Sequence, residues 1–336
     1  MILLVLGLAA CGPAVPTDLP SITEAIPALP ETAVSPVNPS PTAVPMLPTV
    51  LLVMGAQVDP GAAARIEAAV QTLAVENQHI FQVVQELTED QITPNVAIVV
   101  GVGQGLDVAG TADRYPETVF IAIDQAGVAP ADNLNVIGDL VIDQERQAFM
   151  AGYLAALISE DYKVAELVPP ESEGGMMVQD SFVVGAEFFC GSCRPLYPPY
   201  LDFPQIFSLS PEDAVENFQP TVDTLLSNGV EVVYVPGALA TPELLTYLDS
   251  VNLNVIGDSS PDIVRNNWVG TIKADPVPAL RDKWSDWLAG SGGMQIPGSI
   301  TILDLDAGLI SEGRLRMFNE MAADLQAELV LPSSVP

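Results

Sequence analysis

The segment 134-LNVIGDLVIDQERQAFMAGYLAALIS-159 decides the fold, because two different periodicities meet in it. Residues 134–143 form an apolar, β-branched run, which is typical of a buried strand. Residues 144–159 repeat their apolar positions with the period of a helix. Small side chains on this helix would allow another element to pack closely against it: Ala148, Ala151, Gly152 and Ala155. We therefore predict a buried strand that is followed directly by a long helix.

The same alternation of strand and helix extends on both sides of this segment. Before it, apolar runs predict strands at 49–56, 79–87, 96–103 and 119–124, with a helix at 61–75. After it, strands are expected at 162–168, 230–237, 253–260, 268–275 and 299–306. Helical patterns occur at 212–229, 241–252, 277–289 and 314–329. Residues 174–189 are expected to begin as strand or loop and to continue as helix.

Two such series predict an α/β protein with two doubly wound, parallel-sheet lobes joined by a hinge. We expect the first lobe to comprise residues 49–160, completed by parts of 258–290. The second lobe would comprise 161–257, completed by parts of 290–330. Ligands of open α/β sheets bind beyond the carboxyl ends of the strands. In this sequence those ends are followed by Gly101–Gly105, Asp124, Asp143, Gly237 and Asp258.

The N-terminal segment 1-MILLVLGLAAC-11 is too short to span a bilayer as a helix, which needs about 20 apolar residues. It has the length of a secretory signal, and Leu8–Cys11 looks like the box at which bacterial lipoproteins are cleaved and lipidated. The basic residues that usually precede such a signal are absent, because Arg65 is the first one in the chain. We predict a lipoprotein signal over residues 1–11 with Cys11 as the lipid anchor, hence an extracytoplasmic protein held at the bacterial cell membrane. The alternative is an ordinary cleaved signal with an incidental cysteine.

Residues 12–48 contain ten prolines in 37 residues, with no aromatic and no basic side chain. Such a tract cannot bury a core and favours extended polyproline conformations. We predict a semi-rigid linker that holds the folded part of the chain away from the membrane. A plain disordered tail is the alternative.

The charge of the chain excludes several classes of partner. The sequence has 11 basic and 43 acidic residues, which gives a formal net charge of −32. Nucleic-acid phosphates and anionic lipid surfaces are repelled by such a protein. We therefore expect no nucleic acid among the partners, membrane contact only through the lipid anchor, and a monomer.

Cys190 and Cys193 stand in the sequence FFCGSCRP, with the spacing C-x-x-C. Outside the cytosol this pair is most simply a short structural disulfide. A thioredoxin-like redox pair is a second possibility, but that motif opens a helix after a strand, and this sequence is typical of a loop. A zinc site would need more ligands, and the single histidine, His79, has no ligand-like spacing.

The sequence contains no catalytic constellation. VVGVGQG at 99–105 partly resembles a dinucleotide-binding loop, but its last glycine comes one residue early and it follows the third strand. These glycines are better interpreted as a strand-to-helix turn, or as the backbone wall of a ligand cleft. His79 has no setting suited to a Ser-His-Asp triad. We therefore expect no enzyme activity, no cofactor and no metal.

Several motifs follow one another in a familiar order along residues 50–330. They are RYPETVFIAID (114–124), NVIGDLVIDQERQAFMAGYLAALIS (135–159), LLSNGVEVVYVPGA (225–238), VNLNVIGDSSPD (251–262), WVGTIKADP (268–276) and LDAGLISEG (305–313). In this order they resemble the basic membrane protein (BMP) family of ABC-transporter substrate-binding lipoproteins. The resemblance implies a type I periplasmic-binding-protein fold with a ligand between two lobes, and several members of that family bind purine nucleosides.

The resemblance also implies roles for individual residues. By motif, Asp258 and Lys273 would hold ribose hydroxyls, Asp143 would contact the edge of the base, and Phe182 would stack on it. Gly175 and Gly237 would allow close approach of the backbone. Carboxylates and lysine suit a vicinal diol because they offer charge-assisted hydrogen bonds. Alternatively, Asp258 and Lys273 pair only with each other, and Phe182 is a core residue.

We therefore predict a lipid-anchored solute-binding protein that delivers a small polar ligand, such as a purine nucleoside, to an ABC permease. The segment after the first strand, GAQVDPGAAAR (55–65), departs from the family because it has Asp59 but no Ser, Asn or aromatic residue. This departure motivates the alternative, which is a sensor or interaction module of the same fold with a degenerate pocket.

Overall fold

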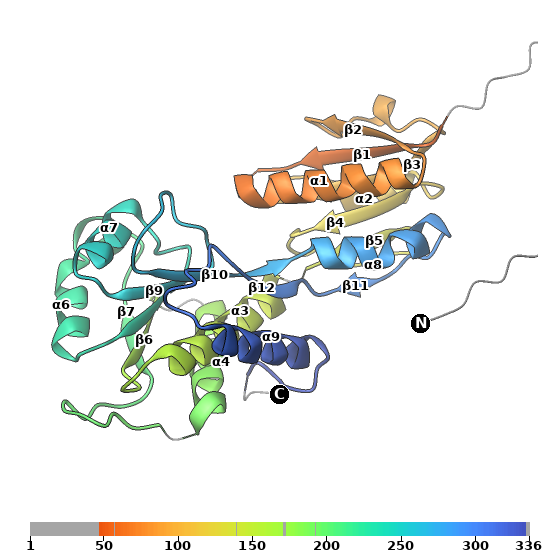
Figure 1. Cartoon of the computed structure of the whole chain (residues 1–336). Helices are drawn as coiled ribbons and strands as arrows, with labels where there is room; N and C mark the ends of the chain where they lie inside the picture. The colour runs from red at the N-terminus through yellow and green to blue at the C-terminus, as the bar shows by residue number, and fades with distance from the viewer. Residues whose placement is uncertain (1–46, 57, 139, 171–172, 192, 334–336) are drawn as a thin grey trace, which may run out of the picture. The chain divides into compact units, whose positions relative to one another are not determined.

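The computed structural model describes residues 47–56, 58–138, 140–170, 173–191 and 193–333 (Figure 1). The predicted signal with Cys11, and the predicted linker up to residue 46, lie outside the described residues. No helix in the described part of the chain is both long and apolar enough to cross a membrane.

The first lobe contains a parallel sheet with the strand order β11-β5-β4-β3-β1-β2. Its strands are β1 (Thr49–Met54), β2 (Ile80–Val84), β3 (Val96–Val102), β4 (Val119–Ile123), β5 (Leu134–Ile137) and β11 (Gln295–Ile296). The helices α1 (Pro60–Glu76) and α8 (Val277–Leu288) cover one face, and α2 (Val108–Arg114) packs on the other (Figure 1). A short 3-10 helix, η1 (Glu89–Gln91), precedes β3.

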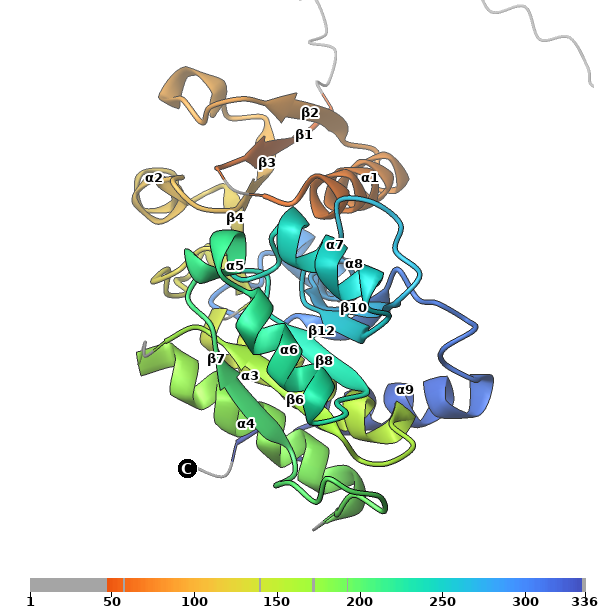
Figure 2. The ribbon, with the colours of Figure 1, turned by 90° about the vertical axis from the view of Figure 1, so that its left-hand side faces the viewer.

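The second lobe contains a sheet with the order β12-β10-β9-β8-β6-β7. Its strands are β6 (Val164–Val168), β7 (Gln205–Ser208), β8 (Val232–Val235), β9 (Asn254–Gly257), β10 (Trp268–Asp275) and β12 (Ser299–Leu303). One face packs on α3 (Leu140–Ile158), α4 (Glu173–Cys190) and α9 (Glu312–Gln326). The other face packs on α5 (Asp213–Glu216), α6 (Gln219–Ser227) and α7 (Pro242–Ser250) (Figure 2). The predicted fold class, two doubly wound α/β lobes, is confirmed.

The chain passes from one lobe to the other three times: after β5, between β10 and α8, and between β11 and β12. The predicted boundary at residue 160 differs from the structure, because α3 packs in the core of the second lobe with side chains such as Phe149 and Leu154. Within 258–290, α8 completes the first lobe and β10 belongs to the second sheet, but β11, which lies in the range 290–330 expected for the second lobe, pairs in the first sheet. Both differences arise because an apolar pattern reveals that an element is buried but not which sheet it faces.

The last strand, β12, is the exception to parallel pairing. It runs antiparallel to β10, with Lys273 opposite Thr301. β11 and β12 are separated only by Pro297 and Gly298, so the chain enters the second sheet without a helix that could return it to the parallel direction. Antiparallel edge strands of this kind are common on otherwise parallel sheets.

Other predicted elements differ at their boundaries. Helix α3 begins at Leu140, four residues before the predicted helix, and residues 174–189 are helical throughout as part of α4. The predicted helix 212–229 is divided into α5 and α6, and Pro220 stands in the first turn of α6. Strand β7 and helix α2 are short elements that the sequence did not predict.

A close contact between α3 and α4 organises the second lobe. A Cβ atom at Gly152 would overlap the carbonyl oxygen of Phe182, and one at Gly185 would overlap the carbonyl oxygen of Phe149. The two glycines therefore allow each backbone to approach the other helix more closely than a side chain would permit. The small residues of 144–159 thus have the packing role that the sequence predicts.

We expect Gly152→Ala to lower the free energy of unfolding by about 3 kcal/mol, because the added methyl group forces α3 and α4 apart. Gly313→Ala in α9 is a matched control, since nothing lies within 4 Å of the added Cβ atom. The control should be neutral or stabilising by up to about 1 kcal/mol through helix propensity. Urea denaturation of both variants measures the difference, and equal effects would contradict a close contact at Gly152.

Candidate functional site

A cavity of about 850 Å³ lies at the carboxyl ends of the strands and is lined by both lobes. The first lobe contributes residues that follow β1, β3 and β4, including Asp59, Gly103 and Asp124. The second contributes residues of β6 and β8, the segments after them and after β9, and Lys273 on β10. The volume falls in the range of small-molecule sites, which is roughly 300–1,000 Å³.

The wall of the first lobe is largely backbone. Gly103 has a φ of +81°, and a Cβ atom there would overlap the side chain of Val58, so the loop after β3 requires glycine at this position. Gln104 fixes the loop, because its Nε2 atom donates to the carbonyl oxygen of Asp124 at 2.6 Å. The interpretation of this glycine-rich turn as a cleft wall agrees with the structure.

In the second lobe, Asp258 is the centre of a hydrogen-bond network. Its Oδ1 atom accepts from the Gly237 amide at 2.5 Å and from the Ser259 hydroxyl at 3.3 Å, and its Oδ2 atom accepts from the Tyr234 hydroxyl at 3.3 Å. Lys273 donates through Nζ to the Asp258 carbonyl oxygen at 2.9 Å. Burial raises the pKa of the Asp258 carboxyl, although the nearby Lys273 charge opposes this rise.

Residues of α3 connect the cavity to the hinge. Asp143, in the first turn of this helix, accepts a hydrogen bond through Oδ1 from the amide of Gly298 at 3.2 Å. This hydrogen bond links the start of α3, just after the passage that follows β5, to the passage between β11 and β12. Gln147, one turn further along, donates through Nε2 to the carbonyl oxygen of Ile272 at 3.1 Å and ties α3 to β10.

Glu166 is a residue of the cavity that the sequence did not single out. It lies in the middle of β6, its side chain is 0% exposed, and neither carboxylate oxygen has a hydrogen-bond partner among the described residues. Burial raises the pKa of its carboxyl well above the usual range. The signal was present in the sequence, because Glu166 interrupts the apolar strand YKVAELV.

The structure brings together four of the six predicted ligand residues: Asp143, Gly237, Asp258 and Lys273 all line the cavity. Asp258 and Lys273 interact through a backbone carbonyl, as well as facing the cavity. Gly175 lies in α4, but its surroundings fall outside what the structure describes.

The prediction for Phe182 requires correction. Its side chain is fully buried in the core of the second lobe and does not line the cavity. The ring stacks on Tyr234, with centroids 5.8 Å apart and planes inclined by 9°. Phe182 therefore supports the cavity wall from behind Tyr234, as the core alternative proposed.

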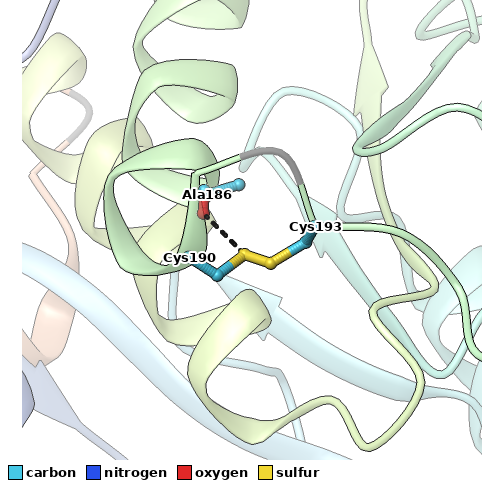
Figure 3. The surroundings of a disulfide bond; sticks show 3 residues. All are labelled: Ala186, Cys190 and Cys193. Carbon is cyan, nitrogen blue, oxygen red and sulfur yellow. Dashed lines mark hydrogen bonds between the residues drawn. A yellow bond between two sulfur atoms is a disulfide. The ribbon is translucent and has the colours of Figure 1, made fainter.

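A disulfide joins Cys190 to Cys193, whose Cα atoms lie 5.7 Å apart (Figure 3). Cys190 is the last residue of α4, so the pair closes the end of a helix and does not open one. This position differs from that of thioredoxin-like motifs and fits a structural staple. Within the described residues, no group of three or more His, Cys, Asp or Glu side chains is arranged to hold a metal ion.

Solved structures resemble this chain at low sequence identity. A transcriptional activator of the comK gene from Bacillus halodurans has a TM-score of 0.56 and 13% identity, and the match covers 84% of this chain and 99% of that one. An ABC transporter solute-binding protein from Aeropyrum pernix K1 has a TM-score of 0.53 and 16% identity, over 84% and 92% of the two chains. These likenesses show the fold, which is that of type I periplasmic-binding proteins.

No protein-family model matches the chain, and no curated protein sequence matches it.

We expect Glu166 to make stability depend on pH in a defined direction. Its folded-state pKa lies above that of the unfolded chain, so its contribution is favourable below pH about 4.5 and is lost as the pH rises through the folded value. The advantage of Glu166→Gln over wild type should therefore grow with pH, by roughly 1 kcal/mol per unit within that window.

Urea denaturation between pH 4 and pH 8 measures this difference. Glu67→Gln on the exposed surface of α1 is the matched control, and its difference from wild type should stay constant. A constant difference for Glu166→Gln as well would contradict an elevated folded-state pKa.

Proposed function

We propose that this protein is an extracytoplasmic solute-binding protein, anchored by a lipid on Cys11, that delivers a small polar solute to an ABC permease. The observation that carries the proposal is the cavity at the carboxyl ends of both sheets, lined by hydrogen-bonding groups of two lobes. Three passages of the described chain join these lobes. The signal-like segment and the proline-rich tract support placement outside the cytoplasm.

The walls suit a solute with several polar groups. Asp258 and Lys273 present a carboxylate and an ammonium group from one lobe, and Asp124 and Gln104 lie on the other. A solute that bridges these groups would favour the arrangement in which both walls contact it, because each lobe alone offers only part of the hydrogen bonds. Binding and lobe arrangement are coupled in this way.

Nucleoside binding stays a prediction within this proposal. The pairing of Asp258 with Lys273 supports recognition of a sugar diol. Stacking of the base has less support, because Phe182 lies behind the wall and Tyr234, which does line the cavity, is only 1% exposed.

A sensor or interaction module of the same fold is the second candidate. It is favoured by the short segment after β1, in which Asp59 is used as the N-cap of α1 and its Oδ1 atom accepts from the Ala62 amide at 2.8 Å. Such a module would keep the fold but have a degenerate pocket, so it would differ from a transport protein in its pocket as well as in its partner. Adjacent permease and ATPase genes would favour the transport role.

We expect the full chain to bind at least one small polar solute from a panel of purine nucleosides, sugars and amino acids. Titration calorimetry measures this binding. Ala62→Trp places an indole in the cavity and should weaken that binding at least about 100-fold, because the solute and the ring compete for one volume. Ala64→Trp is a matched control, since Ala64 is exposed on the same helix and does not line the cavity. Absence of any binding, or binding that survives Ala62→Trp, would contradict the proposed function.

The anchor has a separate test. In a bacterial host, the wild-type chain should incorporate labelled palmitate and sediment with the membrane fraction, whereas Cys11→Ala should do neither. A chain that is released without label would instead support an ordinary cleaved signal.

A further inference from the structure

The described wall of the cavity carries an excess of acid. Its carboxyl groups belong to Asp59, Asp124, Asp143, Glu166 and Asp258, and the one basic side chain among its described lining residues is Lys273. Opposite charges normally accompany buried charges, so an excess of this kind requires either neutralisation by protons or a positively charged group from outside the chain.

Most of these carboxylates already have structural partners. Asp59 caps α1, Asp143 accepts from the Gly298 amide at the hinge, and Asp258 accepts from three donors around it. The charge of Lys273 acts on Asp124 as well as on Asp258. These side chains therefore contribute to the fold whether or not a solute is present.

Glu166 differs from them because it combines complete burial with the lack of any donor among the described residues. Its neighbour in the sheet is Tyr234, whose hydroxyl donates to Asp258 and not to Glu166. A buried carboxylate without any donor is costly, and in native proteins it calls for a specific explanation.

On the basis of the proposed function, we propose that the solute is a small organic cation whose ammonium or guanidinium group pairs with Glu166, a lining residue whose buried carboxylate turns toward the cavity to meet it. An ammonium group supplies three donors, and a guanidinium group supplies a planar fork that matches both oxygens of a carboxylate. Either would provide the donors and the positive charge that the wall lacks. The remaining polar atoms of the solute would face Asp258, Lys273 and Gln104.

An inorganic cation fits this cavity less well. The volume of about 850 Å³ is far larger than a single ion needs, and the described residues contain no cluster of three potential metal ligands. A neutral solute could satisfy Glu166 by hydrogen bonding, but it would leave the excess of negative charge on the wall unchanged. Protonation of Glu166, which its raised pKa favours, would remove its charge but would leave its oxygens without a partner among the described residues. The organic cation accounts for both observations.

Pairs of similar solutes that differ in charge test the proposal by calorimetry on the full chain at pH 7.5. The pairs are glucosamine and glucose, arginine and citrulline, and putrescine and 1,4-butanediol, with adenosine and inosine as neutral nucleosides. In at least one pair the cation should bind at least about 10-fold more tightly than its neutral counterpart, which corresponds to the strength of a charge-assisted hydrogen bond.

Glu166→Gln removes the charge and keeps the shape of the side chain. We expect it to weaken binding of the cation at least about 10-fold, and to raise the melting temperature of the protein without solute because a buried charge is lost. Glu67→Gln, on the exposed surface of α1 and away from the cavity lining, should change neither quantity. A raised melting temperature also shows that weaker binding by Glu166→Gln does not come from misfolding.

The outcomes separate this inference from the proposed function. Tight binding of a neutral member, with its cationic partner weaker, would overturn the cationic solute and leave solute binding intact. Equal affinity of wild type and Glu166→Gln for the cation would overturn the role of Glu166. If neither cations nor neutral solutes bind, both the inference and the proposed function are overturned.

Discussion

The contact of α3 with α4 is the constraint on which the cavity depends. Because Gly152 and Gly185 have no side chains, each helix lies against a backbone carbonyl of the other, and α3 is held in the core of the second lobe. The first turn of α3 carries Asp143, and Gln147 follows one turn later, so both reach the cavity from a fixed position. A bulkier contact between the helices would displace this part of the wall.

The same helix defines how the lobes are joined. It leaves the first sheet after β5, and Asp143 receives a hydrogen bond from Gly298, which stands between β11 and β12. Two passages that are about 155 residues apart in sequence are therefore tied by one side chain that also lines the cavity. A solute that contacts Asp143 would act directly on the hinge, which gives binding a physical route to the arrangement of the lobes.

Local patterns predicted the fold well, and the site in part. The strand ends, and with them Asp143, Gly237 and Asp258, followed from apolar runs and from the rule that ligands bind at carboxyl ends, whereas Lys273, which lies within β10, came only from the resemblance to a known family. The role of Phe182 did not follow, because its position on α4 relative to β8 depends on tertiary packing. The lobe predicted for α3 was wrong for the same reason. Glu166 was visible as a charge within a buried strand, yet its lack of partners is a property of the folded chain.

The net charge of the whole molecule would also affect how the proposed solute reaches the cavity. A net charge of −32 disfavours compactness through self-repulsion, and it also produces a negative potential around the protein. Such a field raises the rate at which small cations reach the surface, and clefts lined by one sign of charge concentrate it. Burial of Glu166 without a partner lowers the stability of the protein. In the proposed complex, the surface charge would attract the cation from a distance, and Glu166 would contact it directly. Both the net charge of the chain and the acidic wall of the cavity would favour a cationic solute.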